Sequence, residues 1–377
     1  MKKLWMELYV ILTKDTVYHL APAVGVKGGG ISDVVMNLCN EQSSEYALVN
    51  VYGGDKNLKN GNFCYQQLTL VKMMFLLLTI LKSQDKHHVI HVHGAWSFQF
   101  IYLRFILSFL NILNCTTIVF QGHGLLDELR VNTKSKYLKI LAWNLYQKAI
   151  LNLSDWIIVT SKTELEGITW CKLKKHKIKE ITLGIGNEFF SKLETIKTKS
   201  SALLYMSQII PIKGLDVLIR AIYKLKNKNI IINLDIYGYG PDSYLKELKE
   251  LTSALDLSEQ IRFLGEVEKM NRVSTLDSYK TFILPSRNES FGLVVPEALS
   301  RGCKVLTTTG TPWNMKPYTE YIDIFECDVS SVVMFLENYM ATDCSLTFEH
   351  QCKQQDFIKS VFNWKEISIK LRRLYVN

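Results

Sequence analysis

The sequence lacks several patterns that would assign it to a well-defined class. Its eight cysteines form no Cys-x-x-Cys pair and no cluster at metal-ligand spacing, which argues against a zinc site and a disulfide framework. There is no Gly-x-Gly-x-x-Gly fingerprint, which argues against a dinucleotide-dependent dehydrogenase. An Asp-x-Asp metal site and a repeat of solenoid period are also missing. We therefore expect reduced thiols in a cytosolic chain and no bound metal.

The excess of positive over negative charge is confined to one half of the chain. Residues 1–200 hold 24 Lys and Arg against 15 Asp and Glu, so the whole net charge of +9 lies there. Such a bias favours nucleic acid, an anionic membrane or phosphorylated substrates. No zinc-finger spacing, recognition-helix pattern or aromatic RNA-binding motif accompanies it, so we expect no nucleic-acid partner. Part of the excess of basic residues is the run at 172–179. Such runs are usually solvent-exposed surface with no binding role.

The long apolar runs are all interrupted. Residues 98–119 contain Arg104 and two asparagines, so we predict a helix over about 97–112 followed by a strand, and a second helix over 71–81. Core helices are favoured over membrane spans, although an exposed apolar face would suit an enzyme docked on a membrane. Near the N-terminus Glu7 interrupts an apolar stretch and no cleavage site follows, so a first strand is favoured over a signal peptide.

Strand and helix patterns alternate through both halves, which predicts α/β folding around two parallel sheets. A chain of 377 residues is comfortable for two domains. The polar stretch at 187–201 is the best linker candidate. The predicted strands cover residues 8–12, 47–51, 89–92, 117–120, 156–159, 178–182, 203–206, 230–237, 262–264, 281–284 and 305–307.

One segment, residues 285–302, places two glutamates around a glycine turn. The preceding apolar run is predicted as a buried strand, and residues 293–301 as a helix. Glu289 then follows the carboxyl end of the strand, where open α/β sheets bind ligands, and Glu297 lies about one turn inside the helix. Such a site suits a sugar nucleotide, because helix N–H groups bind phosphate and carboxylates accept hydrogen bonds from hydroxyls. Taken alone, an amphipathic helix with solvated acids explains the segment equally well.

This segment resembles the signature of glycosyltransferase family 4, the retaining nucleotide-sugar glycosyltransferases of GT-B architecture. The likeness extends through nearly the whole chain in the family's order and spacing. Its further segments are residues 28–30, 91–96, 122–127, 154–161, 211–216, 261–267, 307–313 and 362–364. The resemblance implies two Rossmann-like, doubly wound parallel-sheet domains facing a central cleft. We expect an acceptor domain at 1–196, a nucleotide-sugar domain at 197–360 and a helix at 361–377 that crosses back to the first domain.

The resemblance also implies a donor site. Glu289 would hold sugar hydroxyls, Glu297 the ribose, and Lys213 with Gln208 the diphosphate. Backbone N–H groups of Gly292 and Leu293 would bind a phosphate or the sugar. The remaining expected donor contacts are Gly28, Gly29, Gly30, Gly238, Glu266, Val267 and Phe291. No cofactor is expected, and the donor base, uridine or guanosine, stays open.

Three positions depart from the family pattern. Gln208 stands where the family usually has arginine, so one charged contact to the diphosphate is lost. Leu183 replaces the asparagine of an Asn-Gly turn, and Lys304 replaces a proline. Lys213, Glu289 and the other site residues are kept, so activity is still expected.

In the first domain, His123 lies between two glycines directly after a predicted strand. The resemblance places it against the donor sugar and the acceptor, and together with Glu289 and Lys213 it completes the expected catalytic set. Asp127, His93 and Trp96 are expected acceptor contacts. His91 and His93 are expected to face opposite sides of their strand, one structural and the other lining the cleft.

The expected function is transfer of a hexosyl group, with retention, to a hydroxyl of a glycan that we expect to be lipid-linked. The likeness suggests the branch that builds lipopolysaccharide, capsule or O-antigen, in the cytoplasm at the inner face of the cell membrane. Two alternatives remain open. One is a sugar-nucleotide epimerase or phosphorylase on the same scaffold, and the other is a weakly active binding partner in a polysaccharide assembly.

Overall fold

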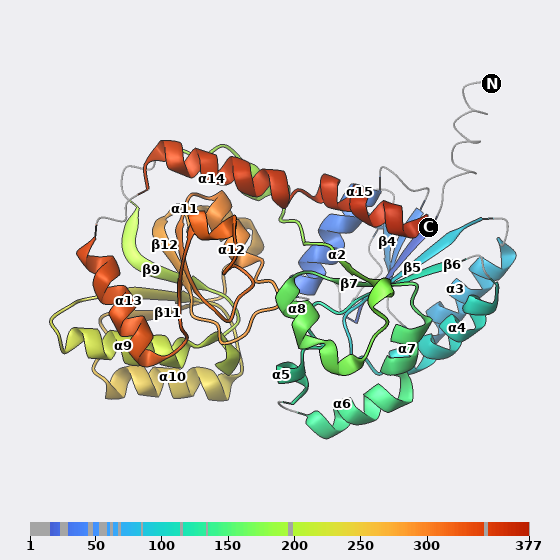
Figure 1. The fold of residues 1–377 in the computed structure, drawn as a ribbon, viewed down its shortest axis with the longest axis horizontal. Coiled ribbons are helices and arrows are strands. Elements are labelled where there is room, and N and C mark those ends of the chain that lie inside the picture. Colours follow the sequence, from blue (N-terminus) through green and yellow to red (C-terminus); the bar gives the residue numbers. More distant parts are fainter. Residues whose placement is uncertain are drawn as a thin grey trace. The chain divides into compact units, whose positions relative to one another are not determined.

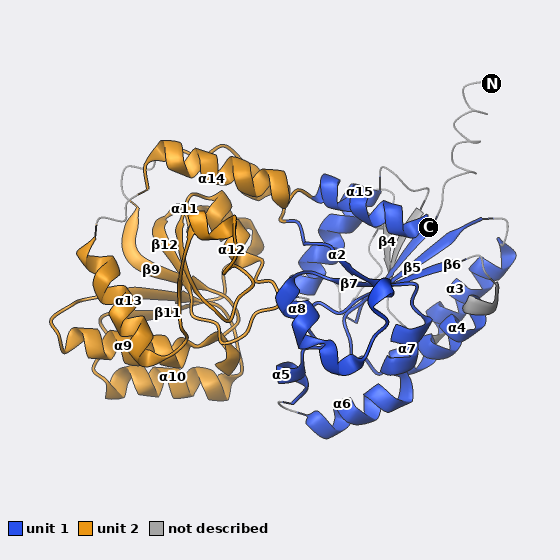
Figure 2. Ribbon diagram, in the orientation of Figure 1, with its two compact units in different colours: residues 1–184, 364–377 blue, residues 185–363 orange. Residues whose placement is uncertain are grey.

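The computed structural model describes most of the chain and forms two compact units. The described residues are 16–22, 29–43, 48–52, 59–60, 63–66, 69–83, 86–113, 116–132, 135–194, 199–342 and 346–376. Unit 1 comprises residues 1–184 and 364–377, and unit 2 comprises residues 185–363 (Figure 2). The division thus lies before the expected 196/197 boundary, and the last segment of the chain belongs to unit 1.

Unit 1 is built on an eight-stranded sheet with the strand order β3-β4-β2-β1-β5-β6-β7-β8. Figure 1 labels β4, β5, β6 and β7 of this sheet. Every neighbouring pair is parallel except β3 with β4. The strands are β1 (Thr16–Leu20), β2 (Leu48–Tyr52), β3 (Lys59–Asn60), β4 (Phe63–Gln66), β5 (His88–His93), β6 (Thr116–Gln121), β7 (Trp156–Val159) and β8 (Ile178–Glu180). The chain builds outward from β1 in one direction and then restarts at β5 on the other side, so the topological switch point lies between β1 and β5.

Helices connect these strands. They are α2 (Gly29–Gln42), α3 (Leu70–Lys82), α4 (Phe100–Leu113), α5 (Glu128–Val131), α6 (Lys136–Ala142), η1 (Trp143–Gln147), α7 (Lys148–Leu153), α8 (Lys162–Gly167), η2 (Thr169–Cys171) and η3 (Lys175–Lys177). The terminal helix α15 (Trp364–Tyr375) packs against α2. Buried apolar residues of β5, β6, α3 and α4 form one core, which explains why these segments read as nearly continuous hydrophobic runs.

Unit 2 has a six-stranded sheet with the order β11-β10-β9-β12-β13-β14, and all its neighbouring strands are parallel. Here the switch point lies between β9 and β12. The strands are β9 (Ser200–Met206), β10 (Leu234–Tyr237), β11 (Ile261–Gly265), β12 (Tyr279–Leu284), β13 (Lys304–Thr308) and β14 (Ile322–Phe325). The helices are η4 (Asn187–Phe190), η5 (Pro211–Lys213), α9 (Leu215–Lys226), α10 (Asp242–Ala254), η6 (Lys269–Asn271), α11 (Arg272–Asp277), α12 (Val294–Ser300), η7 (Tyr318–Glu320), α13 (Val329–Ala341) and α14 (Phe348–Val361).

The prediction of two parallel α/β sheets is confirmed, although several strands were missed. Strand β1 was not predicted, and the expected strand at 8–12 lies outside the described residues. Strands β3, β4 and β14 were also missed. The predicted helices at 71–81 and 97–112 correspond to α3 and α4. Among the residues that the structure describes, none of the helices has the length and apolar character needed to cross a membrane.

Candidate functional site

Lys213 and Glu289 meet at the carboxyl edge of the unit 2 sheet. Lys213 ends η5, which follows β9, and Glu289 lies in the loop after β12, so the pair flanks the switch point. The Lys213 ammonium donates a hydrogen bond to Oε2 of Glu289. The two side chains are only 9% and 7% exposed. The segment 285–302 predicted Glu289 after the carboxyl end of a strand, where α/β sheets bind ligands, but it did not predict the ion pair with Lys213.

The loops that carry this pair are fastened to each other through the backbone. Gly214 adopts a left-handed φ of +72°, and a Cβ there would lie 1.9 Å from the carbonyl oxygen of Pro285, so only glycine fits. The backbone N–H of Arg287 donates to the carbonyl of Ile212 over 2.8 Å. The relative position of the lysine and the glutamate is therefore set by main-chain contacts and does not depend on their own attraction.

The loop after β13 supports Glu289 from the other side. The N–H of Glu289 donates to the carbonyl of Gly310 over 2.9 Å. The indole of Trp313, which is 1% exposed, donates to the carbonyl of Phe291 over 2.8 Å. Gly292, with φ +79°, leaves just enough space for the Glu289 side chain, since a Cβ would lie 2.9 Å from its Cγ. The segments around 285–302 and 307–313 thus form one structural unit.

Glu297 is also engaged in an ion pair. It lies in the first turn of α12, buried, and accepts a hydrogen bond of 2.5 Å from Arg272, the first residue of α11. The Arg272 guanidinium also lies over the ring of Phe189 at 5.6 Å. Arg272 was not predicted, because the sequence around it has no motif and its partner lies 25 residues away.

The other expected donor residues line the same edge of the sheet. Gln208 is exposed after β9 and donates to the hydroxyl of Tyr239 over 3.0 Å. Gly238 comes directly after β10 and lies against the backbone carbonyl of Ser207. A Cβ at this position would lie 1.9 Å from the carbonyl oxygen. Glu266 and Val267 follow β11, the first exposed and the second partly so. These residues all follow parallel strands, whose carboxyl ends share one edge.

A second cation near this edge also escaped the sequence analysis. Arg287 forms a bidentate ion pair with Asp216, over 2.8 and 2.7 Å. Burial acts to raise the pKa of Asp216, but the hydrogen bonds from Arg287 outweigh it, and the pKa is lowered. Arg287 therefore keeps a charged partner at the start of α9.

In unit 1, His123 lies on a strained turn after β6. Its φ of 52° is left-handed, which is uncommon for a residue with a Cβ. The following N–H, of Gly124, donates to Oε1 of Glu164 over 2.6 Å, and the other Glu164 oxygen accepts two hydrogen bonds from Thr160. Burial raises the pKa of Glu164, while these hydrogen bonds act in the opposite direction. Glu164, which the sequence analysis missed, thus anchors the turn that presents His123.

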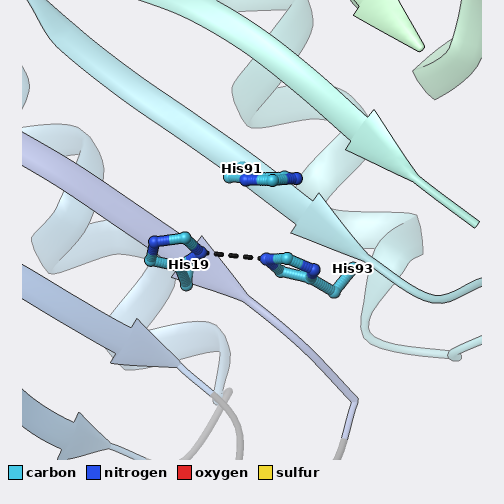
Figure 3. Close-up of side chains that lie close together, drawn as sticks. All are labelled: His19, His91 and His93. Carbon is cyan, nitrogen blue, oxygen red and sulfur yellow. Dashed lines mark hydrogen bonds between the residues drawn. The ribbon is translucent and has the colours of Figure 1, made fainter. Parts of the chain in front are cut away.

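Four histidines lie together at the switch point of unit 1 (Figure 3 shows three of them). His19 on β1 lies directly opposite His91 on β5 in the strand register. The rings of His91 and His93 stack with centroids 4.0 Å apart, and the rings of His93 and His123 lie 5.3 Å apart. The prediction that His91 and His93 face opposite sides was wrong, because residues two apart on a strand share a face.

Burial keeps these histidines neutral. It is the largest cause that lowers the pKa of His19 to about 4, and it also lowers the pKa values of His91 and His93. Burial lowers the pKa of His123 to about 3, although its side chain remains partly exposed. The other members of the cluster are fully buried.

The remaining predicted residues of unit 1 have structural contacts. Trp96 is partly buried, and its indole donates to the carbonyl of Leu125 over 2.7 Å. Asp127 is buried and caps α5 by accepting the N–H of Leu129 over 2.9 Å. Gly29 and Gly30 form the start of α2, whereas Gly28 lies outside the described residues.

Comparison with protein families covers both units. The model of the family "Glycosyl transferases group 1" matches residues 187–322. The model "Glycosyltransferase Family 4" matches residues 28–188. The two matched regions adjoin near the division between the units and include all of the expected site residues.

Curated relatives are less than 30% identical to this chain in the two examples that follow. An uncharacterized glycosyltransferase of Haemophilus influenzae is 29% identical over 156 residues, which cover 41% of this chain and 42% of the relative. An uncharacterized 41.2 kDa protein in the cps region of Klebsiella pneumoniae is 21% identical over 307 residues, covering 77% of this chain and 80% of that protein. The chain thus spans less than half the length of the first of these relatives.

Solved structures with the same fold cover nearly the whole chain. Sucrose-phosphate synthase from Thermosynechococcus elongatus aligns with a TM-score of 0.76 at 16% identity, covering 96% of this chain and 98% of that structure. HepE of Anabaena, in complex with UDP and glucose, gives a TM-score of 0.69 at 14% identity, with coverage of 95% and 98%. WaaG, a glycosyltransferase involved in lipopolysaccharide biosynthesis, gives 0.67 at 12% identity, with coverage of 96% and 99%. These likenesses confirm the predicted GT-B architecture.

Proposed function

Because this chain belongs to the group 1 glycosyltransferases, we propose that it transfers a hexosyl group from a nucleotide diphosphate sugar to a hydroxyl acceptor. The observation that carries the proposal is the buried pair of Lys213 and Glu289 at the switch point of unit 2. A cation suited to a diphosphate and a carboxylate suited to sugar hydroxyls lie side by side there.

Donor binding replaces each partner of this pair with a substrate group. The diphosphate takes the place of Glu289 at the Lys213 ammonium, and sugar hydroxyls take the place of the ammonium at Glu289. Both buried charges then keep a partner. A buried charge without a partner would cost several kcal/mol. Glu297 binds the ribose hydroxyls and retains Arg272 as its neighbour.

The reaction we propose breaks the bond between the anomeric carbon and the diphosphate oxygen and forms a bond from that carbon to the acceptor oxygen on the same face. The acceptor proton passes to the departing phosphate oxygen, so no protein nucleophile is needed. Lys213 stabilises the negative charge that develops on the leaving group, and Glu289 orients the sugar. His123 accepts a hydrogen bond from a substrate hydroxyl.

For the acceptor we propose a lipid-linked glycan of lipopolysaccharide, capsule or O-antigen biosynthesis. The support is the similarity to WaaG, to a protein of a cps region, and an apolar surface on unit 1. Large hydrophobic side chains are exposed on the adjacent helices α3 and α4, among them Phe75, Leu78, Phe105 and Phe109. Together with the positive charge of residues 1–200, this surface suits docking on an anionic bilayer.

The test is a thermal-shift screen of the full chain with UDP-, GDP- and dTDP-sugars, because a bound ligand raises the melting temperature. The best donor is then incubated with lipid-linked acceptors while nucleotide release is followed. Release that depends on the acceptor supports transfer. Donor consumption without an acceptor supports an epimerase or a hydrolytic activity, and a phosphorylase would need inorganic phosphate.

The matched control for this screen is Lys213→Met, which removes the proposed diphosphate contact and should abolish the thermal shift. A chain that binds none of the donors contradicts the transferase and leaves the role of a binding partner. Gln208, which lacks the charge of the family's arginine, is the specific observation that favours this second function.

A further inference from the structure

Three of the four histidines at the switch point of unit 1, His19, His93 and His123, form a directed series of hydrogen bonds. Nε2 of His19 lies 2.8 Å from Oε1 of Gln42, and Nδ1 of His19 lies 2.9 Å from Nε2 of His93. Nδ1 of His93 in turn lies 3.0 Å from Nε2 of His123. The amide nitrogen of Gln42 donates to the hydroxyl of Tyr375 on α15 over 3.3 Å. This series of hydrogen bonds thus runs from the buried amide of Gln42 to His123 on the turn after β6.

The amide oxygen of Gln42, at one end of the series, determines which atom is the donor in each hydrogen bond. An amide oxygen only accepts, so Nε2 of His19 carries the proton that it donates to Gln42. A neutral imidazole has one N–H and one lone pair, so Nδ1 of His19 accepts from Nε2–H of His93. By the same step Nδ1 of His93 accepts from Nε2–H of His123. The lowered pKa values of all three histidines agree with neutral rings.

We propose that Gln42, acting through His19 and His93, fixes His123 as the Nε2–H tautomer, so that Nδ1 of His123 offers its lone pair to a substrate hydroxyl. Gln42, His19 and His93 are then positioning residues and His123 is the residue in contact with substrate. This gives His93, which is fully buried, an indirect role in place of the expected acceptor contact. The use of the lone pair by a substrate rests on the proposed function, whereas the tautomer does not.

A metal ion is the competing account of these rings. His19, His91 and His93 have ligand atoms within 4.8 Å of one another. However, both nitrogens of His19 and both nitrogens of His93 already take part in hydrogen bonds within the described structure. A metal ligand must present a lone pair to the cation. A cation bound here would therefore break the hydrogen bonds that the ring nitrogens of His19 and His93 now make.

The experiment is nitrogen NMR of the full chain with an isotope label on histidine only. The sequence contains eight histidines. Ring nitrogens that carry a proton are distinguished from those with a lone pair, and His123→Gln assigns the signals of that ring. The wild type should show Nε2–H and unprotonated Nδ1 at His19, His93 and His123. A proton on Nδ1 of His123 overturns the proposal, as does a spectrum that changes when EDTA removes a bound metal.

Substitutions at Gln42 test the origin of the direction. Gln42→Leu removes the acceptor, so His19, His93 and His123 should become tautomer mixtures, whereas Gln42→Glu keeps an acceptor oxygen and should preserve the wild-type tautomer at His123. Gln354→Leu replaces another fully buried glutamine, in unit 2, and should leave the histidine signals unchanged. If Gln42→Leu does not fold, Tyr375→Phe frees the amide to rotate and should produce the mixture. An unaltered His123 in a folded Gln42→Leu or Tyr375→Phe chain contradicts the proposal.

Activity provides the separate readout. With a donor and acceptor that the wild type uses, Gln42→Leu should lose about tenfold in kcat with little change in the donor KM, and Gln42→Glu should restore most of it. The predicted tautomer in a chain that transfers no sugar would refute only the proposed function. A mixed His123 tautomer in an active wild-type enzyme would refute only the positioning role.

Discussion

Lys213 and Glu289 lie 76 residues apart in the sequence and form a buried ion pair across the switch point of the second sheet. Main-chain contacts between Gly214 and Pro285 and between Arg287 and Ile212 hold the two loops together. The pair is therefore preorganised, and removing either member leaves the other as a buried charge.

The first prediction concerns the stability of this pair. Lys213→Met should lower the free energy of unfolding by about 3 kcal/mol, because the Glu289 carboxylate loses its partner while remaining buried. Adding Glu289→Gln should recover part of the loss. Urea unfolding of the three chains measures both effects. Lys353→Met, which removes an exposed pair with Glu349, serves as the control. Equal loss from Lys213→Met and Lys353→Met would contradict the importance of burial.

The second prediction concerns the ribose. Glu297→Ala should weaken nucleotide binding by ~1 to 3 kcal/mol, as the loss of a charge-assisted hydrogen bond does. Calorimetry with the nucleotide diphosphate of the best donor gives the affinity. Arg272→Met keeps the carboxylate and should cost less. Glu337→Ala, at an exposed pair with Lys228, is the matched control. A folded Glu297→Ala chain with unchanged affinity would remove the ribose assignment.

The third prediction concerns the residue that departs from the family pattern. Gln208 is exposed and bonds to Tyr239, so an arginine has room to reach the diphosphate. Gln208→Arg should tighten binding of a nucleoside diphosphate and leave binding of the nucleoside unchanged, because the new contact is to phosphate. If Arg287 or another cation already serves this purpose, affinity will not change. Weaker diphosphate binding by a folded variant would show that the alignment of this strand is wrong.

The sequence predicted those features that depend on local pattern. Apolar runs identified β5, β6, β7, β9 and β12, and the turn residues after β12 placed Glu289 at the sheet edge. Strand β14 was missed because Asp323 interrupts its apolar residues. In the structure Asp323 pairs with Lys304 on β13 over 3.0 Å, and Lys304 is the residue that replaces the family's proline. The polar residue thus belongs to an edge strand with a specific partner.

Features that depend on contacts between distant segments were not predictable. Arg272 reaches Glu297, Glu164 reaches Gly124, and Gln42 reaches His19 only once the sheets and helices have assembled. No local motif marks these residues, and each partner lies between 23 and 40 residues away. The histidine cluster required the order of the strands, since His19 and His91 become neighbours only where β1 pairs with β5.

The fourth prediction concerns pH. Because the pKa values of His19, His91, His93 and His123 are lowered in the folded chain, the unfolded chain binds more protons below pH 6.5. Stability should therefore be fully present above pH 6.5 and fall as the pH drops toward about 4, by up to about 1.4 kcal/mol per pH unit for each histidine. The raised pKa of Glu164 acts in the opposite direction.

Urea midpoints measured between pH 7.5 and 5 provide this slope. The His91→Gln chain should show a shallower slope than the wild type, whatever its absolute stability, because one buried titrating ring is gone. His176→Gln alters an exposed histidine and should retain the wild-type slope. A slope that is the same in all three chains would contradict the assignment.

The last prediction concerns the membrane and rests on two independent observations: the net charge of +9 confined to residues 1–200, and the exposed apolar side chains of α3 and α4. The full chain should sediment with vesicles that contain anionic lipid, and the bound fraction should fall as salt is added, because electrostatic reach shortens to about 8 Å at physiological ionic strength. Phe75→Ser with Phe105→Ser should reduce binding at every salt concentration, since both rings are more than half exposed. Met270→Ser, which alters an even more exposed apolar residue of unit 2, should not reduce binding. Equal recovery with neutral and anionic vesicles at low salt would remove the docking proposal and leave the transferase proposal untouched.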